Sequence, residues 1–214
     1  MTIWDQTKAA SAAHPGLDTA DADALTLHLW RRLDFRFLLP VLEPGRVGYA
    51  GAVDAETVAA LRLLDPDADF VPVDGSQTYE NEFDVILLHS PDRRTFESAV
   101  AAMKPGGWMC AEVRSSLLRT SGSRTLLGWE RTFVRAGLQD VGVHWHAPGL
   151  EFPSRIVPVA SAMAVRDALS RHQQVRMGKA KELIGRTALA LGLFAAAVPE
   201  GTVIGRRPCR GDLN

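Results

Sequence analysis

Residues 44–54 read Pro-Gly-Arg-Val-Gly-Tyr-Ala-Gly-Ala-Val-Asp, and this stretch decides the fold. Val47 and Tyr49 favour a strand. The small residues that follow leave the backbone bare, so that a ligand or another backbone can come close. Asp54 is a good N-cap for a helix. A strand that ends in small residues and opens a helix is typical of the nucleotide-binding corner of an open α/β sheet, although the spacing here is not G-x-G-x-x-G.

Strands and helices alternate along the rest of the chain. Apolar runs predict strands at about 46–50, 68–73, 83–89, 108–113, 141–146 and 202–206. Helices are expected at about 21–39, 54–64, 127–136, 161–177 and 179–197, with one more that carries Phe96, Val100 and Met103. Residues 104–107 read as a turn and 148–158 as irregular.

This alternation predicts a Rossmann-like α/β fold, an open and mostly parallel sheet with helices on both faces. The last strand, Thr202–Arg206, is expected to lie antiparallel beside Val141–Trp145. The 214 residues suit a single domain, which we place at 21–208, with a flexible arm at 1–20 and a tail at 209–214.

Composition limits the function classes. The net charge of −1 does not favour a surface for nucleic acid. The longest apolar run, 187–198, is too short to span a bilayer. Cys110 and Cys209 form no CxxC motif, and no signal-peptide pattern opens the chain, so we expect a cytoplasmic protein. Abundant Ala and a preference for Arg over Lys are typical of a GC-rich bacterial genome.

Five short patterns occur in the order typical of one family. They are LLPVLEPGRV at 38–47, DFVPVDG at 69–75, EFDVILLH at 82–89, AMKPGGWM at 102–109, and FVRAGL followed by VGV at 133–143. In these patterns the chain resembles the class I S-adenosylmethionine-dependent methyltransferases. The resemblance implies S-adenosylmethionine as cofactor, S-adenosylhomocysteine as product and a small-molecule acceptor.

The chain also departs from that family. Its first loop lacks the usual acidic residue and the G-x-G-x-G spacing. The span from Gly51 to Asp84 has room for one helix and one further strand, where the family has two of each. Either a βα unit has been deleted, or the elements have been trimmed.

Cofactor binding would need bare backbone at the first loop and a carboxylate for the ribose hydroxyls or the adenine amine. Asp74 is the first choice for that carboxylate and Asp54 the second, although an Asp before Gly is equally often a turn residue. A bulky substitution, Gly51→Trp, is expected to block binding while the fold survives. The candidate cofactor-binding residues are Gly48, Ala50, Gly51, Val53, Asp54, Asp74, Gly75 and Ser90.

The candidate catalytic residues are His89, Asp92, Glu112 and His146. His89 ends a fully apolar strand, and it is either a general base or acceptor-orienting group, or a polar strand cap. Asp92 belongs to Ser90-Pro91-Asp92, which partly matches the family's amine-gripping Asn/Asp-Pro-Pro-aromatic motif, or it caps the next helix. His146 shares a strand face with His144, and in the bland alternative both face solvent. No metal site is expected.

Two functions follow from these residues. The first is a methyltransferase for a small molecule in bacterial specialised, antibiotic-type metabolism. The second is a methyltransferase-like protein that does not methylate, and that serves as a partner subunit or uses the site for another ligand or reaction. Homo- or hetero-oligomers are compatible with either.

Overall fold

The computed structural model describes residues 37–40, 45–51, 55–64, 70–73, 78–115, 125–147, 149–150, 155–171 and 178–209. The strands in this part of the chain are β1 (Val47–Gly51), β2 (Phe70–Pro72), β3 (Phe83–His89), β4 (Met103–Arg114), β5 (Gln139–Ala147), β6 (Arg155–Pro158) and β7 (Glu200–Arg206). The helices are α3 (Ala55–Leu64), α4 (Arg93–Ala102), α5 (Leu126–Arg135), α6 (Ala162–Arg171), α7 (Gly178–Ala190) and α8 (Phe194–Ala197). The predicted arm at 1–20 lies outside the described residues.

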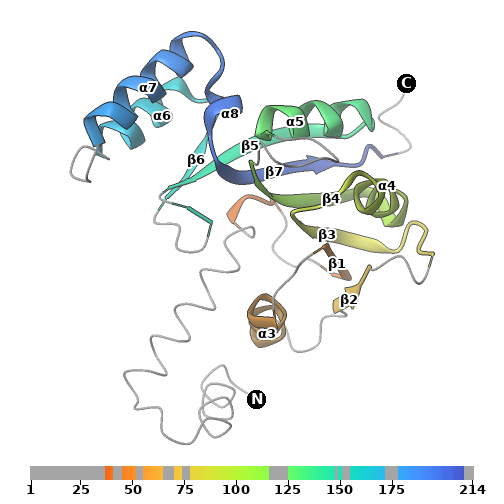
Figure 1. Ribbon diagram of the computed structural model, residues 1–214. Helices are drawn as coiled ribbons and strands as arrows, with labels where there is room; N and C mark the ends of the chain where they lie inside the picture. Colours follow the sequence, from red (N-terminus) through yellow and green to blue (C-terminus); the bar gives the residue numbers. More distant parts are fainter. Residues whose placement is uncertain are drawn as a thin grey trace, which may run out of the picture.

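All seven of these strands form one sheet in the order β2-β1-β3-β4-β7-β5-β6 (Figure 1). β2, β1, β3 and β4 pair in parallel, and β7 lies antiparallel between β4 and β5. The predicted Rossmann-like sheet and the antiparallel last strand are therefore confirmed.

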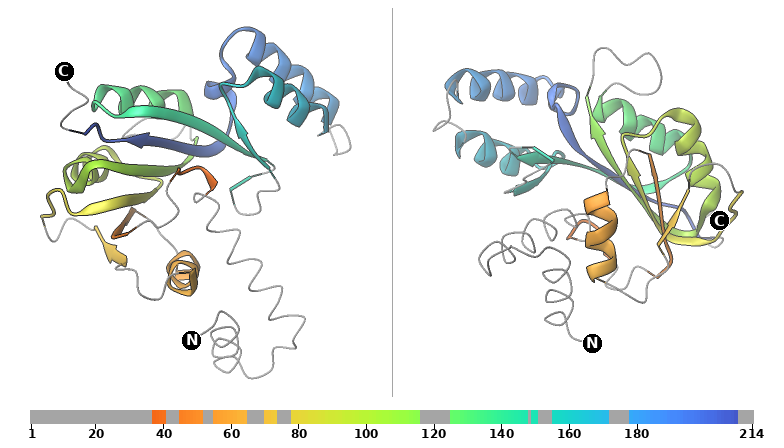
Figure 2. Two further views of the ribbon diagram at one scale, coloured as in Figure 1. Left: turned by 180° about the vertical axis from the view of Figure 1, so that it is seen from behind. Right: turned by 60° about the horizontal axis from the view of Figure 1, so that its bottom comes forward.

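Helices cover both faces of the sheet (Figure 2). On one face α4, α5, α6 and α8 bury a core that includes Phe96, Trp129 and Phe133. On the other face Ala60 and Leu61 of α3 pack with Val47, Val85 and other apolar side chains. The strands between the two cores are apolar on both sides, as expected of parallel strands that are covered twice.

Helix α5 shows how local sequence sets the boundaries of an element. The Thr125 hydroxyl accepts a hydrogen bond from the backbone N–H of Gly128 at 3.1 Å and caps the helix. Leu126, Trp129 and Phe133 recur at helical spacing and are all buried. Gly137, with a φ of +79°, ends the helix in the left-handed conformation that favours glycine.

Four local predictions were wrong. Residues 155–158 form β6 and are not irregular, because they pair antiparallel with the end of β5. Met103 begins β4 and does not end a helix, and residues 104–107 bulge within β4, between the pairs Phe83–Met103 and Val85–Trp108. The helix expected over 179–197 is divided into α7 and α8, since Gly192 adopts a φ of +69° between them.

The span between Gly51 and Asp84 contains few secondary-structure elements among its described residues. Its described residues form α3 and β2, and β2 is an edge strand of the sheet. Among the described residues, this half of the sheet therefore has one helix and one strand between Gly51 and Asp84.

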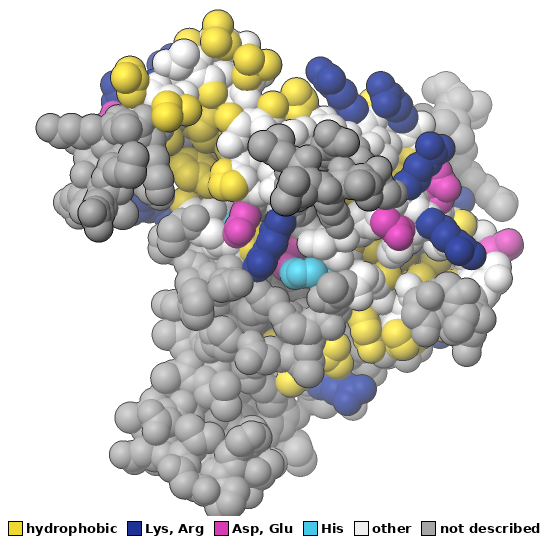
Figure 3. All heavy atoms as spheres, in the orientation of Figure 1, with side chains coloured by type: hydrophobic (Ala, Val, Ile, Leu, Met, Phe, Trp, Pro, Cys, Tyr) yellow, Lys and Arg dark blue, Asp and Glu magenta, His cyan; other side chains and the backbone are white. Residues whose placement is uncertain are grey.

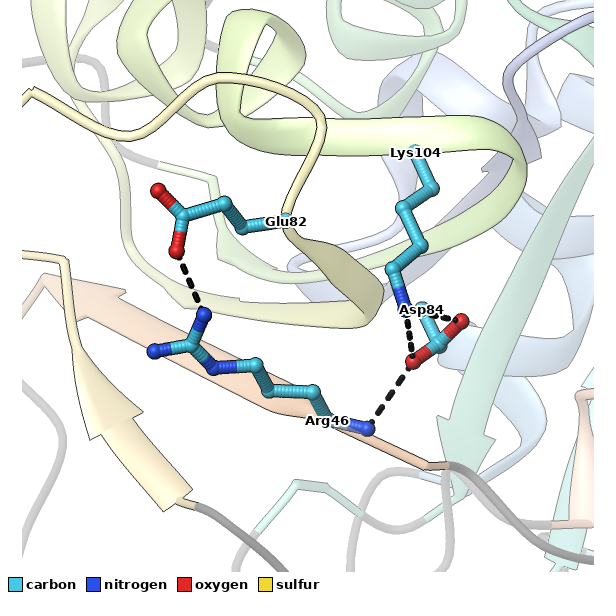
Figure 4. A network of polar contacts seen from close by, with 4 residues as sticks. All are labelled: Arg46, Glu82, Asp84 and Lys104. Carbon is cyan, nitrogen blue, oxygen red and sulfur yellow. Dashed lines mark hydrogen bonds and ion pairs between the residues drawn. The ribbon is translucent and has the colours of Figure 1, made fainter.

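Asp84, near the start of β3, contacts residues at the starts of β1 and β4 (Figure 4). Its Oδ2 accepts the backbone N–H of Arg46 at 3.0 Å, just before β1. The Lys104 ammonium in the β4 bulge donates to Oδ1 and Oδ2 at 2.9 and 2.8 Å. The Arg46 guanidinium in turn pairs with Glu82 and lies 5.0 Å from the centre of the Phe83 ring.

We predict that Asp84→Ala lowers the free energy of unfolding by about 1–2 kcal/mol, mainly because the Arg46 N–H loses its acceptor. The Asp84 and Lys104 side chains are 40% and 41% exposed, so solvent screens their ion pair. Urea denaturation measures the change. The matched control is Glu97→Ala, which removes the exposed ion pair between Arg93 and Glu97 on α4. An equal loss of stability in both variants would contradict the bridging role of Asp84.

Candidate functional site

A histidine–glutamate pair lies at the carboxyl ends of β3 and β4. His89 and Glu112 are direct partners in the parallel ladder. The Nδ1 atom of His89 lies 2.8 Å from Oε2 of Glu112. The two side chains are 19% and 20% exposed, so the pair is held in place and can still be reached from outside. Ligands of open α/β sheets bind at this edge.

Gly51 brings the end of β1 against His89. The two residues are partners in the β1–β3 ladder, and Gly51 has a φ of +95°. A Cβ atom at position 51 would lie 2.1 Å from the carbonyl oxygen of His89, so no side chain fits here. The expectation that Gly51→Trp spares the fold is therefore wrong, because the substitution would displace the backbone of His89.

Gly48 and Ala50 point to the opposite face of the sheet. A Cβ atom on Gly48 would lie 3.0 Å from Val73 and 3.2 Å from Phe83. Ala50 is 4% exposed and belongs to the core under α4 and α5. Their small size serves packing, and only Gly51 of the three lies at the ligand edge. Val53, Asp54, Asp74 and Gly75 lie outside the described residues.

Ser90 and Asp92 shape the chain directly after His89. Ser90 has a φ of +47°, and its backbone N–H donates to the carbonyl oxygen of Glu112 at 2.9 Å. Asp92 caps α4, since its carboxylate accepts the N–H of Thr95 at 2.7 Å. That hydrogen bond lowers the pKa of Asp92. Asp92 thus has the capping role that its sequence position allowed, and its side chain is exposed.

His146 is buried on β5. It is 1% exposed, and its Nε2 atom lies 2.8 Å from the hydroxyl of Thr202, which is also 1% exposed. The alternative in which this histidine faces solvent is therefore wrong. The pKa of His144 is lowered by burial and, to a lesser extent, by the neighbouring His146.

The ladders place these polar groups in one row on one face of the sheet. Gly51 is opposite His89, His89 is opposite Glu112, Glu112 is opposite Thr202, and Thr202 is opposite His144. Sequence reasoning found the three acid–base candidates on β3, β4 and β5 but missed Thr202. Only its place in the final strand, with a hydroxyl among apolar residues, hinted at a polar contact. On the face drawn in Figure 3, a histidine side chain reaches the surface beside acidic and basic side chains.

The described residues also bear on metal binding and on membrane spans. Among them, no group of three or more His, Cys, Asp or Glu side chains is placed to hold a metal ion. No helix in the described part of the chain is long and apolar enough to cross a membrane.

No protein-family model and no curated protein matches this chain. Among solved structures it is similar to a SAM-dependent methyltransferase from Thermotoga maritima, described as a possible histamine N-methyltransferase, with 11% identity over 86% of this chain and 91% of that one and a TM-score of 0.47. It is also similar to the [4+2]-cyclase SpnF, with 16% identity over 97% of this chain and 93% of that one and a TM-score of 0.39.

A third similar structure is phosphoethanolamine N-methyltransferase 2 of Haemonchus contortus, in complex with phosphomonomethylethanolamine and S-adenosylhomocysteine. The identity is 13%, the match covers 84% of this chain, and the TM-score is 0.46. The chain spans 53% of that protein's length.

The fold is a Rossmann-like open α/β sheet in which β7 lies antiparallel between β4 and β5. A fold alone does not fix an activity, so the function is carried by the residues of the site.

We predict that Thr202→Val lowers the free energy of unfolding by about 1–3 kcal/mol, because the buried Nε2 of His146 loses its hydroxyl partner. Guanidinium denaturation measures the loss. Thr187→Val is the matched control, since the Thr187 hydroxyl bonds to the Leu183 carbonyl on the exposed side of α7. If Thr202→Val were as mild as the control, the contact between His146 and Thr202 would contribute nothing to stability.

Proposed function

We propose that this chain is a cytoplasmic methyltransferase that uses S-adenosylmethionine and acts on a small molecule of bacterial specialised metabolism. One observation carries the proposal. The bare backbone of Gly51 and the hydrogen-bonded pair His89–Glu112 lie side by side at the carboxyl edge of the sheet. A cofactor cradle beside an acid–base pair is the arrangement that methyl transfer to a weakly nucleophilic group needs.

We place the cofactor at the first loop. A Cβ at position 51 would collide with the His89 carbonyl, so the chain has only backbone there, at the carboxyl end of β1. We place S-adenosylmethionine against Gly51 and the residues that follow it to 53, with Asp74 and Gly75 toward the adenosine and Asp54 as the second carboxylate. Val73, the last described residue before them, donates its N–H to the Tyr49 carbonyl at 2.7 Å, next to the end of β1. When bound, the cofactor supplies a methyl group on a positively charged sulfur.

Two residues would act on the acceptor, and two would support them. His89 takes or orients the acceptor's proton, and Glu112 holds the imidazole ring by its Nδ1 atom. Asp92 fixes the start of α4 directly after His89. His146 supports the same face of the sheet through Thr202, which lies opposite Glu112. We therefore assign proton transfer to the exposed pair, and support to Asp92 and His146.

One structural feature favours the second function. The described residues between Gly51 and Asp84 form one helix and one short strand, β2, which is at the edge of the sheet, close to where the adenosine would lie. A site reduced in this way could have lost the cofactor and kept its acceptor pocket, or could depend on a partner subunit. Direct binding of the cofactor separates the two functions.

We predict that the full-length protein binds S-adenosylhomocysteine with a Kd below about 1 mM, as measured by isothermal titration calorimetry. Asp74→Asn should weaken binding by about tenfold or more, because the adenosine loses a charged hydrogen-bond acceptor. His89→Ala should leave the affinity unchanged, since His89 acts on the acceptor.

The control is Asp167→Asn, which alters an exposed aspartate on α6 that pairs with Arg171. Its affinity should equal that of the unmodified protein. An absence of binding at millimolar ligand, with the fold intact by circular dichroism, would replace the methyltransferase by the protein that does not methylate.

A further inference from the structure

His89 offers only one of its two ring nitrogens to a ligand. The carboxylate of Glu112 can accept a hydrogen bond but has no proton to give. In the neutral ring, the contact of 2.8 Å puts the imidazole hydrogen on Nδ1 and leaves a lone pair on Nε2. In that tautomer Nε2 can accept a hydrogen bond and a proton, and the side chain is 19% exposed, so a ligand can reach it.

The surrounding backbone fixes the ring in this position. Gly51 is the register partner of His89, and no Cβ atom would fit between its backbone and the His89 carbonyl. The N–H of Ser90, at a φ of +47°, is tied to the carbonyl of Glu112 at 2.9 Å. Because Glu112 is also the register partner of His89, backbone and side chains hold the two residues together. The ring is preorganised to receive a donor at Nε2.

Acceptor groups differ in whether they need such an atom. A carboxylate has already lost its proton, and a neutral amine attacks through a free lone pair and loses its proton afterwards. A phenolic hydroxyl, with an ordinary pKa of about 10, keeps its proton at neutral pH and is a poor nucleophile until that proton is drawn away. Of these groups, the hydroxyl is the one that a neutral Nε2 beside the cofactor cradle both recognises and activates.

We infer that the acceptor group is a weakly acidic hydroxyl, such as a phenol or enol, which donates its hydrogen bond to Nε2 of His89. This inference rests on the proposed function and names its substrate class. In the transfer, the hydroxyl proton passes to Nε2 and the acceptor oxygen forms a bond to the methyl carbon. The carbon–sulfur bond breaks, and its electron pair stays on sulfur to give the neutral thioether. Glu112 then faces the imidazolium and stabilises its charge.

The test compares two probes of one shape that are both uncharged at neutral pH, para-cresol and para-toluidine. Each is titrated into the full-length protein, alone and with S-adenosylhomocysteine, and binding is followed by isothermal titration calorimetry. The unmodified protein should bind the phenol about tenfold more tightly than the aniline, which corresponds to one hydrogen bond of about 1.4 kcal/mol.

Three variants separate the role of Nε2 from general packing. His89→Ala should reduce the preference for the phenol to about onefold. Glu112→Gln keeps an acceptor for Nδ1 and should retain most of the preference, whereas Glu112→Leu should lose it. Circular dichroism checks that each variant is folded, and rescue by Gln distinguishes positioning of the ring from a merely structural role of Glu112.

Equal affinity for the two probes in the unmodified protein would overturn the inference, whether both bind weakly or strongly. A preference that survives His89→Ala would also overturn it, because another group would then receive the hydroxyl. Failure of the proposed function has a separate signature. In that case S-adenosylhomocysteine does not bind. The ratio of the affinities for the phenol and the aniline, measured without S-adenosylhomocysteine, then still tests whether His89 receives the hydroxyl.

Discussion

The parallel register of β1, β3 and β4 is the constraint on which the rest of the site depends. It brings Gly51, His89 and Glu112 to the same level, although 38 and 23 residues of chain separate neighbouring members of this set. In a sheet the side chains alternate between faces, so a slip of one residue would turn His89 or Glu112 to the other face. The hydrogen bond between the two side chains exists only in the observed register.

The two ends of β3 make different contacts. At the amino end, the Asp84 carboxylate accepts hydrogen bonds from the Arg46 N–H just before β1 and from the Lys104 ammonium in β4, and so connects the starts of the three strands. Roughly 16 Å further along, at about 3.3 Å per residue, His89 ends the strand among groups that a ligand can reach. Between them the residues from Val85 to Leu88 are buried on both faces. Anchoring one end by polar contacts and the middle by apolar packing leaves the other end available for chemistry.

Two buried polar side chains, Thr202 of β7 and His146 of β5, lie on the same face of the sheet as the pair His89–Glu112. Thr202 and His146 lie in the interior and bond to each other, and Thr202 faces Glu112 across the β4–β7 ladder. A buried imidazole without a partner would be costly, so this contact keeps the polar face of the sheet compatible with a packed interior. The last strand, β7, is thereby connected to the pair His89–Glu112 through Thr202, the register partner of Glu112.

The sequence by itself determined the alternation of strands and helices, the antiparallel end of the sheet and the place of His89 at the end of a strand, because these depend on local hydrophobic patterns and on where an apolar strand stops. It also showed that the span from Gly51 to Asp84 is short, since that is a matter of length. Only the tertiary structure decided which polar residues meet. Glu112 became the partner of His89, His146 became a buried partner of Thr202, and Asp92 became a helix cap. Gly48 and Ala50 turned to the core while Gly51 faced the site. Sheet register and burial set these contacts, and both arise from residues far apart in the chain.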